Sequence, residues 1–175
     1  MYREATALDI DAIAGLHADS WRRNYRGAYL DAFLDGDVFA DRLAVWTNRL
    51  TSGRPSDYTI VGELDGTVRG FAHTISDADP TWGALVENLH VAHDLKGQGV
   101  GSRLMAEAAR TLMRRRPSMG LYLNVLEQNV AAQAFYDARG GTCVGRSLGG
   151  PFPGGGRAVV LTYTWPDPSA LLGRD

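Results

Sequence analysis

The sequence predicts a single mixed α/β domain, and three observations support this prediction. The length of 175 residues fits one compact domain with a buried core. An apolar fraction of 45% and a charged fraction of 22% are typical of a globular protein. The hydrophobic pattern is helix-like at the start of the chain and then alternates between strand-like and helix-like segments. This order favours one α/β domain in which helices and strands are mixed.

The first part of the chain is predicted to be helical. Apolar residues recur at helical spacing over residues 8–21, with Thr6 and Asp9 as candidate caps. A short helix is expected over residues 29–34. A longer one is expected over residues 38–50, where a Ser-Gly pair and a proline end the pattern.

Strands and helices alternate in the rest of the chain. An Asp-Gly pair at residues 65–66, between two β-branched runs, predicts a hairpin over residues 58–76. The elements expected after it are a strand over 81–91, an amphipathic helix over 100–116, a strand over 121–126, a helix from Asn129 to Gly140, and strands over 141–148 and 157–165. Residues 1–166 are therefore expected to form the domain, and residues 167–175 a solvated tail.

Charge and cysteine content exclude several classes of function. A net charge of −2 gives no global basic field, so neither nucleic acid nor a membrane surface is an expected partner. The chain has no signal-peptide pattern and no run of about 18 apolar residues, so the expected location is the cytoplasm. The single cysteine, Cys143, excludes an internal disulfide and a cysteine-based zinc site, and no metal is expected. Its place in a predicted strand suggests a core position.

A glycine-rich stretch precedes the amphipathic helix. In HDLKGQGVGSRL, residues 93–104, Gly97, Gly99 and Gly101 alternate with other residues just after Lys96. A helix N-terminus presents unpaired N–H groups, and glycines let a phosphate approach them closely. The alternative is a tight turn, but one glycine would suffice for that. The Walker pattern has no match here, and Ser102 follows where the dinucleotide fingerprint needs a third glycine.

The same stretch resembles the acyl-CoA binding loop of the GCN5-related N-acetyltransferases (GNAT family). Residues 96–101 fit the pattern [QRK]-x-x-G-x-[GA]. ENLHV ahead of it, LYLNVLEQNVAAQAFYDARGG after it and HADSWRRNYRG near the start resemble further segments of bacterial, small-substrate members. The resemblance implies a central, mostly antiparallel mixed sheet flanked by helices, with splayed fourth and fifth strands. It also implies acetyl-CoA as co-substrate and one acetyltransferase domain.

The resemblance assigns roles to residues around the loop. The loop amides would hold the pyrophosphate, and the backbone of the fourth strand would pair with the pantetheine arm. Lys96 keeps a hydrogen-bond donor where Arg or Gln is more usual. Asn129 would contact the arm, although a helix cap explains it equally well. The residues expected to bind the co-substrate are Leu89, Val91, Lys96, Gln98, Gly99, Val100, Gly101, Ser102 and Asn129.

Two residues are expected to act in catalysis. The Tyr136 hydroxyl would lie near the sulfur and protonate the departing thiolate, the alternative being a half-buried aromatic residue. Glu87 precedes Leu89 by two in a strand, which predicts the same face and a role as base. The alternative is a strand-end residue paired with an arginine.

Histidines and a cysteine are the other candidates for chemistry. His90 is predicted on the opposite face from Glu87, and His73 and His93 are alternative bases. No acetyl-cysteine intermediate on Cys143 is expected.

The acceptor site is the least determined part. Its candidates by location are Trp21, Tyr25, Tyr29, Trp82 and Phe152. The loop GGPFPGGG, residues 149–156, is either a lid or a disordered hairpin loop. Asp31, Asp35 and Asp37 either favour a cationic acceptor or form a solvated surface.

The expected reaction is acetyl transfer from acetyl-CoA to a primary amine by direct attack in a ternary complex. The acceptor would be a small molecule or a peptide, and the family resemblance allows a homodimer. The alternative is a CoA-binding sensor or partner-binding module without catalysis.

Overall fold

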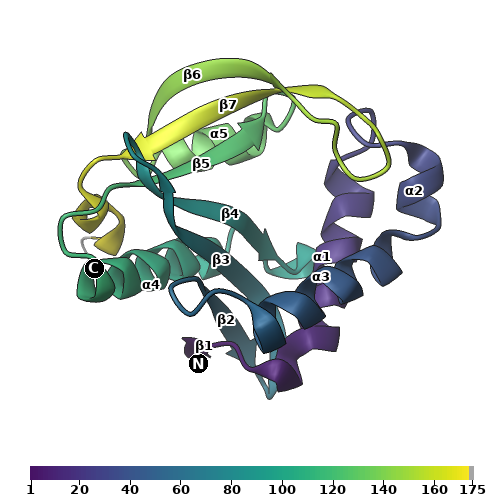
Figure 1. The fold of residues 1–175 in the computed structure, drawn as a ribbon, viewed down its shortest axis with the longest axis horizontal. Helices are drawn as coiled ribbons and strands as arrows, with labels where there is room; N and C mark the ends of the chain where they lie inside the picture. The colour runs from purple at the N-terminus through teal and green to yellow at the C-terminus, as the bar shows by residue number, and fades with distance from the viewer. Residues whose placement is uncertain (174–175) are drawn as a thin grey trace.

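A computed structural model of the chain describes residues 1–173, which form a seven-stranded sheet between two layers of helices (Figure 1). The strand order is β1-β2-β3-β4-β5-β7-β6. The strands are β1 Tyr2–Glu4, β2 Tyr58–Leu64, β3 Thr67–Asp79, β4 Gly83–Val91, β5 Leu121–Leu126, β6 Thr142–Gly149 and β7 Ala158–Trp165. Neighbouring strands are antiparallel except β4 and β5, which are parallel. The predicted mixed, mostly antiparallel sheet is confirmed.

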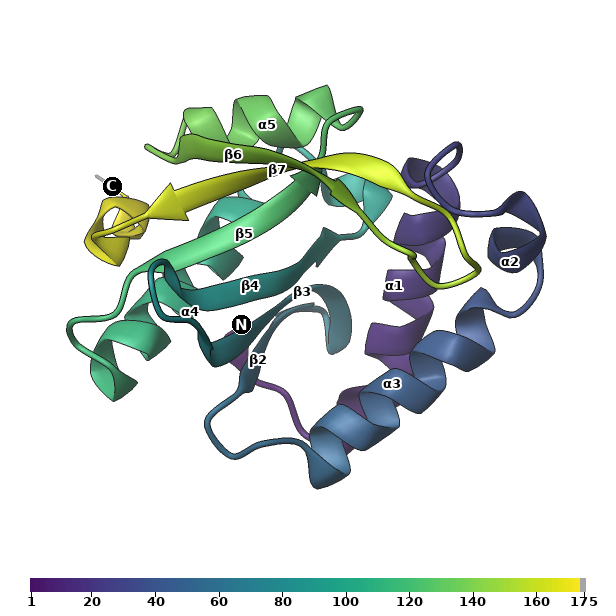
Figure 2. The ribbon, with the colours of Figure 1, turned by 45° about the horizontal axis from the view of Figure 1, so that its top comes forward.

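The helices cover opposite faces of this sheet (Figure 2). They are α1 Ile10–Asn24, α2 Asp31–Asp35, α3 Val38–Ser52, α4 Val100–Arg115 and α5 Val130–Asp137. On one face, Trp46 of α3 packs with Phe71 of β3. On the other, Leu104 of α4 packs with Ala72 of the same strand. Within residues 1–173, no helix combines the length and apolar character needed to cross a membrane.

The N-terminus contains a strand that sequence reasoning did not predict. β1 pairs antiparallel with β2, with Arg3 opposite Val61. Arg3 also donates to the Asp9 carboxylate at 2.8 Å, and Asp9 forms a capping box with Thr6 at a 3-10 turn that leads into α1. Three residues are too few to show a strand period, so β1 depends on its partner strand. The predicted caps at Thr6 and Asp9 are confirmed as one joint motif.

β4 and β5 touch at only one end. Their pairs are Ala84 with Leu121 and Leu85 with Tyr122, although β4 continues to Val91. The register of β4 against β3 also shifts at Glu87, which marks a β-bulge there. A bulge bends its strand and increases its twist. The two strands therefore diverge (Figure 2), as the resemblance implies.

The C-terminal segment is not a solvated tail, which corrects the expectation for part of it. Residues Pro168–Leu172 form a 3-10 helix that packs against α4, and Leu171 is only 5% exposed. Leu171 belongs to the same core cluster as Leu112. A single apolar pair after a proline carries no periodic signal, so the sequence pattern did not reveal this contact.

Replacement of Leu171 by alanine should lower the free energy of unfolding by about 2–5 kcal/mol, because it leaves a cavity under α4. Urea denaturation followed by circular dichroism measures this change. Leu8→Ala is the matched control, since Leu8 is 95% exposed, and it should change stability by less than about 0.5 kcal/mol. Equal small effects of both substitutions would contradict the packing described here.

Cys143 is exposed rather than in the core, which corrects a second expectation. It lies on β6, the last strand in the sheet order, which pairs with β7 on one side only. Most side chains of β6 are exposed, so a strand pattern at this position does not imply burial.

Candidate active site

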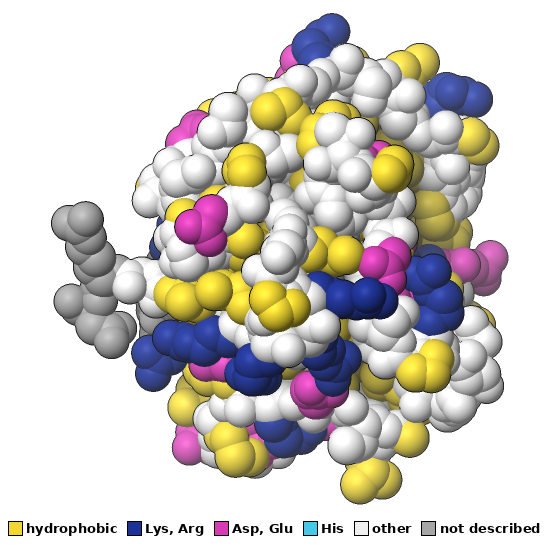
Figure 3. All heavy atoms as spheres, turned by 60° about the vertical axis from the view of Figure 1, so that its left-hand side comes forward, with side chains coloured by type: hydrophobic (Ala, Val, Ile, Leu, Met, Phe, Trp, Pro, Cys, Tyr) yellow, Lys and Arg dark blue, Asp and Glu magenta, His cyan; other side chains and the backbone are white. Residues whose placement is uncertain are grey.

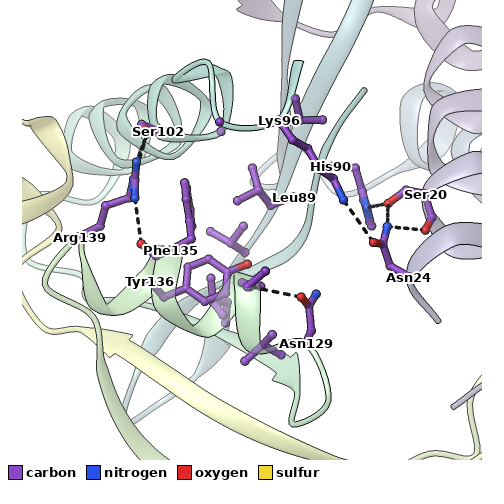
Figure 4. Close-up of a pocket in the computed structure, with 18 of the residues that line it drawn as sticks. Ser20, Asn24, Leu89, His90, Lys96, Ser102, Asn129, Phe135, Tyr136 and Arg139 are labelled. Carbon is purple, nitrogen blue, oxygen red and sulfur yellow. Dashed lines mark hydrogen bonds between the residues drawn. The ribbon is translucent and has the colours of Figure 1, made fainter. Parts of the chain in front are cut away.

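A pocket of about 430 Å³ lies in the slot between the diverging strands. Its walls come from β4 and β5, the C-terminal end of α1, the glycine-rich loop with the start of α4, and α5 (Figure 4). The pocket is therefore open to both faces of the sheet. Helices α4 and α5 border it on one face, and α1 borders it on the other.

The glycine-rich loop leads directly into α4. Gly97 and Gly99 have φ angles of +78° and +82°, which residues with a Cβ rarely adopt. Arg103 N donates to Gly99 O at 3.0 Å, so the first-turn amides of residues 100–102 precede the first intrahelical bond. The loop thus turns an open helix N-terminus toward the pocket, as an anion site requires.

Gln98 and Val100, two of the loop residues predicted to bind the co-substrate, do not face the pocket. The Gln98 amide donates to Leu95 O at 3.3 Å, and its side chain donates to Asp94 O at 2.8 Å. Neither Gln98 nor Val100 lines the pocket. The preceding turn thus already uses the Gln98 amide, which was expected among the loop amides that would hold the pyrophosphate.

Lys96 and Asn129 both line the pocket and both have partners within the chain. Lys96 Nζ donates to Asn24 Oδ1 of α1 at 3.2 Å. The Asn129 carboxamide oxygen accepts from Ala132 N at 3.2 Å, which confirms the predicted helix cap (Figure 4).

Some backbone N–H and C=O groups of β4 point into the slot between β4 and β5. Ala92 N donates to Arg69 O of the β3 side at 2.8 Å. Alternate residues of a strand direct their N–H and C=O to opposite edges, so Leu89 and Val91 direct theirs away from β3, toward the slot. Since β5 pairs with β4 only as far as Leu85, these groups lie where an extended ligand could pair with them.

Glu87 lies at the bulge and lines the pocket, and it is ion-paired with Arg49 of α3. Arg49 also donates to Asn88 Oδ1 at 2.7 Å. The predicted common face of Glu87 and Leu89 is wrong: Leu89 packs on the α4 side, whereas Glu87 meets α3. The bulge breaks the alternation on which that prediction depended. The arginine partner was the alternative interpretation, and the structure contains one.

His90 and His73 are buried and neutral. His90 Nδ1 lies 2.7 Å from Ser20 Oγ, and the His90 ring lies 4.5 Å from that of His17. His73 Nδ1 lies 2.8 Å from Thr59 Oγ1. Burial lowers the pKa of both His90 and His73 to about 3, so each is a weak base at neutral pH. His93 is exposed in the turn before the loop.

Acidification should destabilise the protein between about pH 6.5 and about pH 3. Within this window the unfolded histidines bind protons that folded His73 and His90 do not, so the free energy of unfolding falls as the pH falls. Each contributes about 1.4 kcal/mol per pH unit. Urea midpoints at pH 7, 6 and 5 measure the slope. A flat profile would contradict the buried neutral state of His73 and His90.

Tyr136 extends from α5 with its hydroxyl directed into the pocket (Figure 4). Burial raises its pKa, so the phenol keeps its proton at neutral pH. A second phenol lines the pocket from α1: burial raises the pKa of Tyr25 to about 12. The pocket therefore holds two protonated hydroxyls from opposite walls.

The loop at residues 149–156 docks against the α1–α2 region. The Phe152 ring stacks on Tyr29 at 4.9 Å and 15°. A Cβ at Gly156 would lie 2.0 Å from Ala28 O, so only glycine allows this approach. Phe152 of the loop packs against the same hydrophobic cluster as Trp21 and Tyr29.

Three residues named as candidates for the acceptor site do not support one: Trp82 lies outside the pocket, and Asp31 and Asp35 are ion-paired. Trp82 packs on Tyr122, and neither residue lines the pocket. Asp31 and Asp35 both pair with Arg26 at the surface. This pairing favours the solvated-surface interpretation over a cationic acceptor subsite.

Four polar residues that line the pocket were not predicted from the sequence: Ser20, Asn24, Asn124 and Arg139. Arg139 follows Tyr136 by three residues, so its place at the end of α5 could have been read from the chain. Its hydrogen bond to Ser102 joins residues 37 apart and depends on the packing of two helices.

A splayed mixed sheet with a pocket in its slot and an open helix N-terminus beside it defines the acyl-CoA N-acyltransferase class of fold. The sequence profile of the acetyltransferase (GNAT) family matches residues 14–141, and the chain belongs to this family. The predicted enzyme class, an acyltransferase, agrees with this membership.

Known proteins similar to the chain include two named N-acetyltransferases. A 5-NmdU N-acetyltransferase of Pseudomonas phage PaMx11 is 39% identical over 90 residues, which span 51% of this chain and 61% of that protein. The uncharacterized N-acetyltransferase YuaI of Bacillus subtilis (strain 168) is 28% identical over 172 residues, 97% of this chain and 94% of that protein.

A solved structure shares the fold. The PaiA N-acetyltransferase of Thermoplasma acidophilum, in complex with coenzyme A, superposes with a TM-score of 0.69 at 16% identity. The alignment covers 94% of this chain and 98% of that one.

Proposed function

We propose that this protein transfers the acetyl group of acetyl-CoA to a primary amine, by direct attack within a ternary complex. The observation that carries the proposal is the pocket in the slot between β4 and β5. It lies between Tyr136 on one side of the sheet and Glu87 on the other, so a thioester in the slot would be accessible to an amine from the α1–α3 side.

The co-substrate half of the proposal rests on backbone groups. The amides at the start of α4 would bind the pyrophosphate, and the slot-facing groups of Leu89 and Val91 would pair with pantetheine as an added strand does. Solved proteins of this fold from Thermoplasma acidophilum and Salmonella typhimurium are described with coenzyme A and acetyl-CoA respectively. This supports acetyl-CoA as the co-substrate.

The chemical step requires two proton transfers. The amine nitrogen attacks the thioester carbonyl carbon, a C–N bond forms and the C–S bond breaks. Glu87 takes the proton from the amine, directly or through water, and Tyr136 gives its proton to the departing thiolate. The exposed position of Cys143, outside the pocket, supports direct transfer without an acetyl-cysteine intermediate. The name of the phage relative supports nitrogen as the acceptor atom.

A CoA-binding module without catalysis is the second candidate. The ion pair between Arg49 and Glu87 favours it, because Arg49 already neutralises the carboxylate that the reaction needs. Under the catalytic proposal, a cationic acceptor competes with Arg49 for Glu87.

An acceptor screen separates the two candidates. Free CoA thiol is measured with acetyl-CoA and a library of amines that includes polyamines, amino acids and peptides, and mass spectrometry identifies the acetylated product. We expect amine-dependent thiol release with a matching N-acetyl product. Thermal stabilisation by acetyl-CoA without any amine-dependent release would instead establish the binding module.

A further inference from the structure

Arg139 lies at the end of α5, where it lines the pocket beside the start of α4 (Figure 4). Its side chain is held from three directions. The guanidinium stacks on the Phe135 ring at 3.7 Å, Nη1 donates to Phe135 O at 2.9 Å, and Nε donates to Ser102 Oγ at 3.0 Å. Such a guanidinium loses little further freedom when it binds a ligand.

The charge of Arg139 has no acidic partner among residues 1–173 within ion-pair distance, unlike many arginines at the surface. Figure 3 shows arginine and lysine side chains in a band mixed with acidic ones. At the end of α4, Arg115 pairs with Glu4 and Arg116 with Asp77, each at 2.7 Å. Burial also lowers the pKa of Arg139, as expected for a cation without a counter-ion. An anion in the pocket would supply the missing charge.

The contact with Ser102 orients a hydroxyl. Both Nε and Nη2 of Arg139 donate to Ser102 Oγ. A serine hydroxyl has one donor hydrogen and two acceptor lone pairs, so Ser102 directs its hydrogen away from Arg139. Ser102 lies in the first turn of α4, where the amides of residues 100–102 are also open. The Ser102 hydroxyl and these amides therefore lie together at the start of α4.

The number of hydrogen-bond donors around Arg139 indicates which kind of anion would bind there. Of the five N–H groups of Arg139, three are used within the chain and two remain. Two guanidinium N–H groups, a hydroxyl and a row of helix amides suit an anion with several oxygens, as a pyrophosphate has. A carboxylate would leave part of this set unused.

We propose that Arg139 binds the pyrophosphate of the CoA co-substrate, both with its two remaining N–H groups and by orienting the Ser102 hydroxyl. This inference rests on the proposed use of CoA and adds a residue that follows α5 to a subsite otherwise built from the loop before α4.

Isothermal titration with CoA and with dephospho-CoA tests the proposal, because dephospho-CoA lacks the 3′-phosphate and keeps the pyrophosphate. Arg139→Gln should weaken both ligands about tenfold, which corresponds to about 1.4 kcal/mol. It should also make the affinity less sensitive to salt between 50 and 500 mM, since a phosphate–guanidinium attraction is screened. Arg103→Gln is the matched control, because exposed Arg103 lies beside Ser102 in sequence and carries the same charge.

Each result has a distinct meaning. If Arg139→Gln weakened the binding of CoA but not of dephospho-CoA, Arg139 would contact the 3′-phosphate instead. If neither affinity changed, Arg139 would not contribute to the site. Either outcome overturns the proposal. A wild-type protein that binds neither ligand would contradict the proposed function itself. Should Arg139→Gln fail to fold, Arg139→Lys keeps the charge but cannot form the two-pronged contact, and an affinity equal to wild type would overturn the orienting role.

Discussion

Replacement of Tyr136 by phenylalanine is expected to lower kcat for acetyl transfer by about 10²–10⁴-fold, the usual contribution of a positioned general acid. The Tyr136 hydroxyl faces the pocket, and its buried environment keeps it protonated at neutral pH. Phenylalanine keeps the ring and its edge contact with Trp165 but lacks the proton. The thiolate would then leave without a proton donor, while the dissociation constant for acetyl-CoA should stay within about twofold.

Stopped-flow measurement of thiol release gives kcat, and calorimetric titration gives the dissociation constant for acetyl-CoA. Tyr163→Phe is the matched control, because Tyr163 packs in the same aromatic cluster and does not line the pocket. If kcat were unchanged in Tyr136→Phe but reduced in Tyr25→Phe, the general acid would be Tyr25 instead.

Replacement of Glu87 by glutamine is the second substitution with a large expected effect. Glutamine keeps the shape and can still accept a hydrogen bond from Arg49, but it cannot take a proton from the amine. We expect kcat/KM at neutral pH to fall by about 10²–10⁴-fold.

Initial rates at neutral pH are measured with the best acceptor from the screen. Glu127→Gln is the matched control, since Glu127 also pairs with an arginine, Arg146, but lies outside the pocket. A kcat/KM of Glu87→Gln equal to that of the wild type would place the base elsewhere, for example in a chain of water molecules.

The features of the site that depend on residues close together in the chain were predictable from the sequence. The glycines at 97 and 99 indicated an unusual backbone, and both have the positive φ that requires glycine. Asn129 was predicted to cap a helix because its side chain can satisfy the next turn, as it does. Tyr136 follows two turns later on the same helix, so its place on the pocket side follows from helical spacing.

The errors have a common physical cause. The orientation of Glu87 was predicted from the alternation of an ideal strand, but a bulge changes the register at that residue. Cys143 lies on a strand, yet its exposure follows from the place of β6 at the edge of the sheet. Leu171 is buried because α4 offers an apolar surface to it. None of these outcomes depends on the residue and its neighbours alone.

The sequence by itself therefore determined the order of the helices and strands from α1 to β7, and the open helix N-terminus behind its glycine-rich loop. These follow from hydrophobic period, capping and backbone freedom, which act over a few residues. The tertiary structure decided that Glu87 faces Arg49 and that Arg139 reaches Ser102. Those contacts join residues 38 and 37 positions apart. They depend on how far β4 and β5 diverge and how the helices pack around them.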